Sequence, residues 1–352
     1  MHEEGIAVQA AQSFAYEIRK DSAVIWRCFS RDTRAEIPAQ IQGYPVTELA
    51  PYAFSAHMDE RELQNKINAG TVQIYVPGVL KGCIEEESLS GLFPLCGEQL
   101  EEIVLPGTVR RVGRYCFYDC GSLHRIEFWG TLTDWGSGVF TRCHHVKELR
   151  VYTDRDGKSY LKDVLDELPE TLAVEYCCPK AAEETGPSYD RAVLVFPEFY
   201  EEGVENTPAR ILETHVHGSG ISYRNCFQGR KFDFVQYDTL FPQAKALESR
   251  EVLALMVSGR LRYPVGLAEK AREQYERYVF EHAREIAGWM LQKRDLEGIR
   301  WLAELTAGVP DREVLLEEMA EHASRLHYTE AVSYLMDCRR DSRRAGRKRL
   351  EL

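Results

Sequence analysis

Apolar residues recur at intervals of 23 positions between residues 103 and 151. Ile103, Ile126 and Leu149 are equivalent at this spacing. The same offset relates Leu105 to Phe128 and Val151, Val112 to Trp135, Phe117 to Phe140, and Cys120 to Cys143. A unit this short cannot bury its apolar residues alone. The period therefore predicts stacked units whose equivalent Phe and Cys side chains form internal columns.

Each unit predicts one short strand followed by a return arc. Ile103 and Leu105 lie two positions apart, as on one face of a half-buried strand. Pro106 and Gly107 then end the strand, because proline has no N–H for the ladder and glycine permits a turn.

Two irregular units precede the regular ones. Phe54 and Phe93 come before Phe117 at steps of 39 and 24 residues. The long first step contains residues 58–70, a charged insertion that predicts a short helix or a loop.

The segment from Ala35 to Phe54, which reads AEIPAQIQGYPVTELAPYAF, resembles the BspA-type leucine-rich repeat. That family's pattern is Ile-Pro, then Val-Thr-x-Ile, then Ala-Phe. Residues 105–120 fit the same pattern, and residues 14–18 and 23–26 resemble the strand hairpin that often opens such arrays. The resemblance covers about residues 12–155. It implies a curved, strand-rich scaffold that is used for protein contacts and has no catalytic residues.

A helix predicted over residues 161–170 would close the array, since terminal repeats need cover for their exposed column. We therefore expect residues 1–178 to form the leucine-rich-repeat domain. Residues 188–240 contain apolar runs at 192–196 and 211–216, which predict strands. We interpret residues 188–240 as a β-rich connector.

From residue 241 the apolar residues adopt helical spacing, over residues 244–261 and 267–292. A second period of 33 residues relates Ile286 to Met319, Ala287 to Ala320, Ile299 to Val332, and Leu302 to Leu335. Residues 319–336 resemble the paired helices of an ankyrin repeat, without its usual Thr-Pro-Leu-His opening. Generic helical hairpins are the alternative.

The predicted fold class is thus α+β. It consists of an N-terminal strand-rich leucine-rich-repeat solenoid, a small β connector, and a C-terminal α-helical, ankyrin-like repeat region over residues 241–338.

The net charge of −12 disfavours broad affinity for phosphate backbones. Residues 339–352 are an exception, with seven basic residues between Arg339 and Arg349. We expect a disordered, solvated tail there. Nucleic-acid association through this tail is an alternative function.

Localisation and cofactor use follow from what the sequence lacks. The segment Met1–Gly5 shows no basic and then apolar leader, and no run of 18 apolar residues occurs, so we expect a cytoplasmic protein with mostly reduced cysteines. Cys116, Cys120 and Cys143 favour buried packing thiols over a zinc site. No cofactor or metal is predicted, and phosphate-loop and hydrolase-elbow motifs are absent.

These observations favour a non-catalytic intracellular scaffold for protein–protein interaction, whose partner and oligomeric state the sequence leaves open. The candidate partner-binding residues are the aromatic side chains Tyr44, Tyr118 and Trp129. An alternative is an enzyme or small-ligand binder with its site in residues 190–240. That site would need one pocket that contains the side chains of Glu198, Tyr200, His215 and Tyr223.

Overall fold

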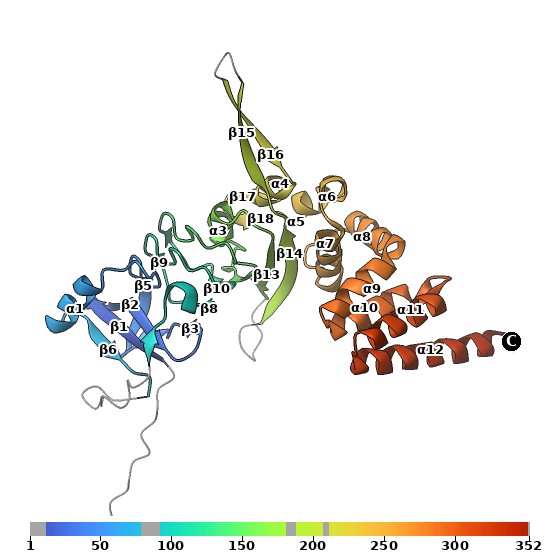
Figure 1. Ribbon diagram of the computed structural model, residues 1–352, viewed down its shortest axis with the longest axis horizontal. Coiled ribbons are helices and arrows are strands. Elements are labelled where there is room, and N and C mark those ends of the chain that lie inside the picture. Colours follow the sequence, from blue (N-terminus) through green and yellow to red (C-terminus); the bar gives the residue numbers. More distant parts are fainter. Residues whose placement is uncertain (1–11, 79–91, 181–187, 207–210, 351–352) are drawn as a thin grey trace, which may run out of the picture. The chain divides into compact units, whose positions relative to one another are not determined.

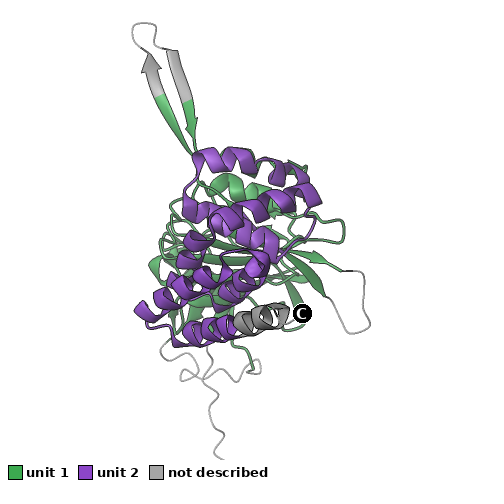
Figure 2. Ribbon diagram, turned by 90° about the vertical axis from the view of Figure 1, so that its right-hand side faces the viewer, with its two compact units in different colours: residues 1–191, 196–233 green, residues 192–195, 234–352 purple. Residues whose placement is uncertain are grey.

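The computed structural model describes residues 12–78, 92–180, 188–206 and 211–350 (Figure 1). The chain divides into two compact units (Figure 2). Unit 1 comprises residues 1–191 and 196–233, and unit 2 comprises residues 192–195 and 234–352. The region 188–240, expected to be a separate connector, is thus divided between the two units.

A six-stranded sheet, here called the repeat sheet, belongs to unit 1 except for residues 192–195 of its edge strand β14, and its central strands are parallel. Its strands, in spatial order, are β14 (Tyr189–Phe196), β13 (Leu172–Pro179), β12 (Glu148–Tyr152), β10 (Arg125–Trp129), β8 (Glu102–Val104) and β3 (Arg34–Glu36). Ile126 on β10 is in register with Ile103 on β8 and with Leu149 on β12. The 23-residue period is therefore confirmed as the step from one parallel strand to the next.

The return arcs of the same units form part of a second sheet. Its strands are β1 (Gln12–Arg19), β2 (Ser22–Ser30), β4 (Gln40–Ile41), β5 (Tyr44–Leu49), β6 (Gln73–Tyr75), β7 (Phe93–Pro94), β9 (Arg111–Val112) and β11 (Asp134–Trp135). Val112 pairs in parallel register with Trp135, as the 23-residue offset predicts. The predicted opening hairpin is also confirmed, because β1 and β2 are antiparallel neighbours.

In the turns that follow the strands of the second sheet, equivalent aromatic rings form a buried column. The ring centroids of Phe54 and Phe117 lie 5.5 Å apart, and those of Phe117 and Phe140 lie 5.6 Å apart. The Cys120 thiol donates to the Phe54 carbonyl at 3.2 Å, and the Cys143 thiol donates to the Phe117 carbonyl at 2.9 Å. These cysteines therefore join consecutive units as buried donors, which matches the predicted packing role. Phe93, expected to mark a unit between Phe54 and Phe117, is instead 63% exposed on β7 and lies outside the column.

Thiol chemistry offers a direct test of this core. Burial raises the pKa of Cys28 to about 12 and that of Cys177 to about 11. Of the nine cysteines in the described residues, only three are half-buried, and these are Cys96, Cys178 and Cys338. We expect iodoacetamide at pH 8 to alkylate those three within the native protein and to reach the other six only in denaturant. Peptide mass spectrometry checks this, and fast native labelling of Cys120 or Cys143 would contradict it.

Two helices of unit 1 have clear local causes. The insertion after Phe54 forms α1 (Glu60–Asn68), which begins at Asp59 because this carboxylate accepts the N–H groups of Arg61 and Glu62. The predicted closing helix is α3 (Leu161–Glu167). It ends before residue 170 because Pro169 disfavours helical geometry in the residue before it.

The rest of unit 1 follows β14. An antiparallel hairpin of β15 (Tyr200–Asn206) and β16 (Ile211–His217) forms a two-stranded sheet of its own. The chain continues through α4 (Gly220–Arg224), β17 (Phe227–Gln228) and β18 (Lys231–Phe232).

Unit 2 is helical apart from residues 192–195, which belong to β14. Its helices are α5 (Phe234–Thr239), α6 (Phe241–Leu247), α7 (Arg250–Arg262), α8 (Glu269–Glu281), α9 (Ala283–Gln292), α10 (Leu296–Leu305), α11 (Arg312–Arg325) and α12 (Thr329–Leu350). The predicted helix over residues 244–261 is split, because Ser249 caps α7 by accepting the Val252 N–H. Within the described residues, no helix is both long and apolar enough to cross a membrane.

The 33-residue period corresponds to a repeated helical hairpin. Arg294, between α9 and α10, and His327, between α11 and α12, are 33 positions apart and both adopt left-handed backbone angles, with φ of 55° and 51°. The residue after each donates its N–H to a carbonyl five positions back, at 2.9 Å in both turns. The two hairpins therefore share one turn geometry.

The basic C-terminus differs from expectation. Residues 339–350 continue α12 as a helix, whereas the sequence predicted a disordered tail. Arginine, lysine and leucine are good helix formers, and cations near a helix C-terminus interact favourably with its dipole. Arg339 also pairs with Glu317 of α11 at 2.9 Å, which holds the start of this segment.

Candidate functional site

The outward side chains of the repeat sheet form one continuous surface, here called the strand face. Along each strand they alternate with fully buried residues such as Ile126 and Phe128. The strand face consists of Glu102, Val104, Arg125, Glu127, Trp129, Glu148, Arg150, Tyr152, Ala173 and Glu175. Because the register is fixed over four parallel strands, these side chains stand in straight rows across the sheet.

A ladder of ion pairs occupies the centre of the strand face. Arg150 lies between two carboxylates, 3.5 Å from Glu127 and 2.7 Å from Glu175. In the neighbouring row, Arg125 pairs with Glu148 at 2.9 Å. The hydrogen bond to Glu175 raises the pKa of the half-buried Arg150 guanidinium. The ladder fixes long side chains in place, and its three carboxylates outnumber its two guanidinium groups, so the centre of the face is slightly negative.

Aromatic rings lie at the carboxyl ends of the same strands. Trp129 stacks on Tyr152 with a centroid separation of 4.2 Å and an interplanar angle of 13°. Tyr189, at the start of β14, meets both rings edge-on, at 6.0 Å from Trp129 and 5.1 Å from Tyr152. These half-buried rings give the face a rigid aromatic edge of the kind that anchors protein partners.

Beside this edge lies a groove of about 660 Å³, here called the carboxyl-end groove. It runs across the carboxyl ends of β3, β8 and β10. Its lining consists of Gln12, Phe14, Glu36, Ile37, Pro38, Ala39, Pro77, Val104, Leu105, Pro106, Gly107, Glu127 and Trp129. The groove is therefore mostly apolar, with two carboxylates and no basic side chain among the lining residues.

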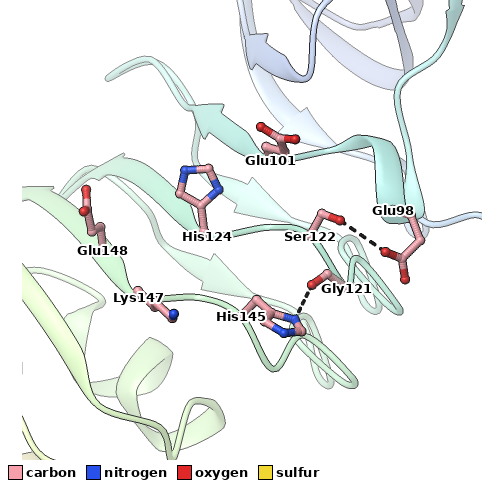
Figure 3. Close-up of a pocket in the computed structure, with 8 residues that line it drawn as sticks. All are labelled: Glu98, Glu101, Gly121, Ser122, His124, His145, Lys147 and Glu148. Atoms are coloured by element: carbon pink, nitrogen blue, oxygen red, sulfur yellow. Dashed lines mark hydrogen bonds between the residues drawn. The ribbon is translucent and has the colours of Figure 1, made fainter.

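The amino ends of the strands open onto a different, polar pocket of about 500 Å³ (Figure 3). Its lining consists of Glu98, Glu101, Gly121, Ser122, His124, His145, Lys147 and Glu148. Glu101, His124 and Lys147 are 23 positions apart and lie on successive units, joined by backbone hydrogen bonds of 2.9 and 3.0 Å. Ser122 donates to Glu98 at 3.1 Å. This end of the array alternates in charge and lacks an apolar anchor.

The structure places the three predicted partner-binding residues on separate surfaces. Trp129 belongs to the strand face. Tyr44 is 39% exposed on β5, in the second sheet. Tyr118 lies on the return arcs, where its ring meets that of Tyr115 at 5.8 Å and that of His57 at 4.9 Å. A single compact surface on the repeat sheet can therefore include Trp129 but not Tyr44 or Tyr118.

The alternative ligand residues do not line a common pocket. Tyr223 is fully buried in the core of unit 1, out of reach of a ligand at the surface. Tyr200 is 60% exposed and stacks on His217 with ring centroids 4.5 Å apart. His215 is exposed on β16, and Glu198 is exposed before β15, its N–H donating to the Thr171 hydroxyl at 3.1 Å. The four residues are close in the sequence, but the burial of Tyr223 separates it from the three exposed side chains.

Sequence reasoning missed Arg150, Tyr152 and Tyr189. The first two had a detectable signal, since they follow Glu127 and Trp129 by the 23-residue period. Tyr189 had none, because it comes from β14, outside the regular units.

Residues 90–156, which contain β8, β10 and β12, match the family model of the BspA type leucine rich repeat region (6 copies). The chain is also similar to a leucine rich repeat protein of T. pallidum with a solved crystal structure. That match has 20% identity and a TM-score of 0.21, and it covers 39% of this chain and 68% of the other. No curated protein matches the chain. The sequence resemblance to BspA-type leucine-rich repeats is thus confirmed for residues 90–156.

Proposed function

We propose that this protein is a non-catalytic interaction module that binds a protein partner through the strand face. The observation that carries this proposal is the alignment of ion pairs and stacked aromatic rings in fixed register over parallel strands. Repeat arrays present such surfaces because their buried columns hold the shape while the exposed residues vary freely. The match to leucine-rich repeats supports the same role.

We extend the proposal to unit 2, whose two equivalent hairpins would be ankyrin-like repeats and a second scaffold surface. The shared turn at Arg294 and His327 supports this reading. The cytoplasmic location stays a prediction from the sequence.

The experiment places a photo-crosslinking amino acid at position 152 of the full chain, with position 61 on α1 as the control, in lysate of the source cells. Mass spectrometry identifies proteins captured from position 152 alone. The partner is then purified, and its affinity for the full chain is measured by calorimetry. Equal capture from both positions would count against the strand face as the binding surface.

Charge reversal at the centre of the ladder then tests the surface itself. Arg150→Glu would bring a third carboxylate against Glu127 and Glu175, so we expect it to weaken binding of that partner about tenfold or more. Arg61→Glu on exposed α1 makes the same change in net charge and should leave the affinity unchanged. Circular dichroism melts verify that both variants fold. A folded Arg150→Glu variant with wild-type affinity would remove the strand face from the proposal.

A further inference from the structure

The carboxyl-end groove has the features of a site for an extended peptide. Its floor includes the buried side chains of Ile37 and Leu105, and Pro38, Pro77 and Pro106 contribute to its walls. Proline rings are apolar and rigid, and they offer no backbone N–H to a ligand. A peptide bound here gains contact area, but receives few hydrogen bonds from these walls.

Strand addition to the outer edge of β3 is blocked by a side chain. The Gln12 amide donates to the Arg34 carbonyl at 2.6 Å and accepts the Glu36 N–H at 3.1 Å. These two backbone groups flank Ala35, and a parallel partner strand would bond the same pair. Since the side-chain amide already occupies them, a ligand at this edge cannot bind by main-chain pairing to β3.

Trp129 supplies a fixed donor at the other end of the groove. One face of its ring stacks on Tyr152, and a ring atom lies 3.3 Å from the place where a Cβ on Gly107 would stand. The ring is thus held between Gly107 and Tyr152, and a larger residue at position 107 would crowd it. Within the described residues the indole N–H makes no hydrogen bond, so it is available to a ligand carbonyl.

The negative charge of the groove favours a positively charged ligand. Its two ionisable lining residues are Glu36 and Glu127. The Glu36 side chain is 68% exposed, and its ion pair with Arg34 is long, at 3.7 Å. A lysine or arginine of a ligand would find an accessible carboxylate there, whereas an acidic ligand would be repelled.

We propose that the carboxyl-end groove binds an extended, proline-containing segment of the partner protein with a lysine or arginine close to the proline. A polyproline II segment keeps its backbone solvated and its carbonyls free, so it needs apolar contact, one good donor and no strand pairing. The groove offers that combination through its proline walls, the Trp129 indole N–H and the closed β3 edge. This inference rests on the proposed function, since it names the chemistry of the segment bound at one end of the strand face.

Random dodecapeptides displayed on phage are selected for binding to the immobilised full chain. Phage that also bind the Trp129→Ala variant are then removed. The expected result is enrichment of sequences with proline and a basic residue. For synthetic peptides of those sequences, fluorescence anisotropy should show binding weakened about 30-fold by Trp129→Ala and about fivefold by Trp129→Phe, which keeps the ring and loses the N–H. Glu36→Gln should weaken binding about threefold at low salt, while Glu62→Gln on α1, an equal change in charge, should not.

Four outcomes would overturn the inference. They are no enrichment, enrichment of sequences without proline or basic residues, binding that Trp129→Phe leaves intact, and binding that appears only after deletion of residues 2–11. The last would show that the chain's own N-terminal segment occupies the groove. If any of these outcomes occurred while Arg150→Glu still weakened partner binding, the peptide inference would fail but the proposed function would stand.

Discussion

Arg224→Met is expected to lower the free energy of unfolding of unit 1 by about 3–5 kcal/mol, because it leaves several buried acceptors unsatisfied. Arg224 is buried in unit 1. Its guanidinium donates to the backbone carbonyls of Leu165, Leu168, Glu170, Pro197 and Gly220. Burial lowers the pKa of Arg224 to about 10, which leaves it charged at neutral pH. Methionine fills much of the volume, but it removes a donor from each of five carbonyls, several of them buried.

The measurement is urea unfolding of the full chain, followed through alkylation of the buried Cys116 so that unit 1 is monitored separately. Arg224→Lys keeps the charge but has three donors in place of five, so an intermediate loss is expected. The control is Arg155→Met, which changes an exposed arginine of the same unit and should cost less than about 0.5 kcal/mol. A loss below about 1 kcal/mol for Arg224→Met would mean that water replaces the guanidinium at these carbonyls.

The repeat sheet was predictable because its cause is periodic. A 23-residue period in Ile103, Ile126 and Leu149 determines both the strand order and the register, since each unit must cover the apolar residues of the next. The period also explains glycine at 113 and 136, where a Cβ would collide with the backbone of the preceding arc. Such constraints act between residues one repeat apart, so they leave a period that is visible in the sequence.

The three largest fully buried side chains among the described residues were not predictable, because they are arginines. Arg27, Arg224 and Arg260 are each at most 2% exposed, although arginine is rarely buried without a partner. Most of their partners are backbone carbonyls or carboxylates that lie 22 or more residues away in the sequence. The nearer contacts include Arg224 with the Gly220 carbonyl and Arg260 with the Val265 carbonyl. No local pattern in the sequence records such a contact, so only the three-dimensional structure reveals it.

The candidate site was predictable to a similar extent. Trp129 was identified as an exposed aromatic residue, and Tyr152 was recoverable as its equivalent one unit later. The carboxyl-end groove was not, because it brings together Gln12, Pro77 and Pro106 from strands and loops with no common period. The same limit explains the grouping of Tyr200 with Tyr223, which lie only 23 positions apart but differ completely in burial.

In unit 2, Asp238→Leu and Arg260→Met are each expected to cost about 3–5 kcal/mol, while the double variant costs far less than their sum. Arg260 donates to the two Asp238 carboxylate oxygens at 2.8 Å each, and both residues are at most 3% exposed. Burial works to lower the pKa of Arg260, but the Asp238 carboxylate outweighs it and raises that pKa. Either single change leaves an unpaired buried charge, whereas the double change removes both charges.

Tyr275→Phe provides the matched smaller change, because the Tyr275 hydroxyl donates to the same carboxylate at 2.9 Å. Its loss should cost about 1.5–3 kcal/mol, as expected for a hydrogen bond to a charged group. The two single variants, the double variant and Tyr275→Phe are unfolded in urea, and hydrogen exchange in α7 and α8 serves as the readout. The first three give the coupling energy between residues 238 and 260. A coupling of at least about 2 kcal/mol is expected. Additive losses would show that each residue is stabilised by other contacts, such as the bond from Arg260 to the Val265 carbonyl at 3.0 Å.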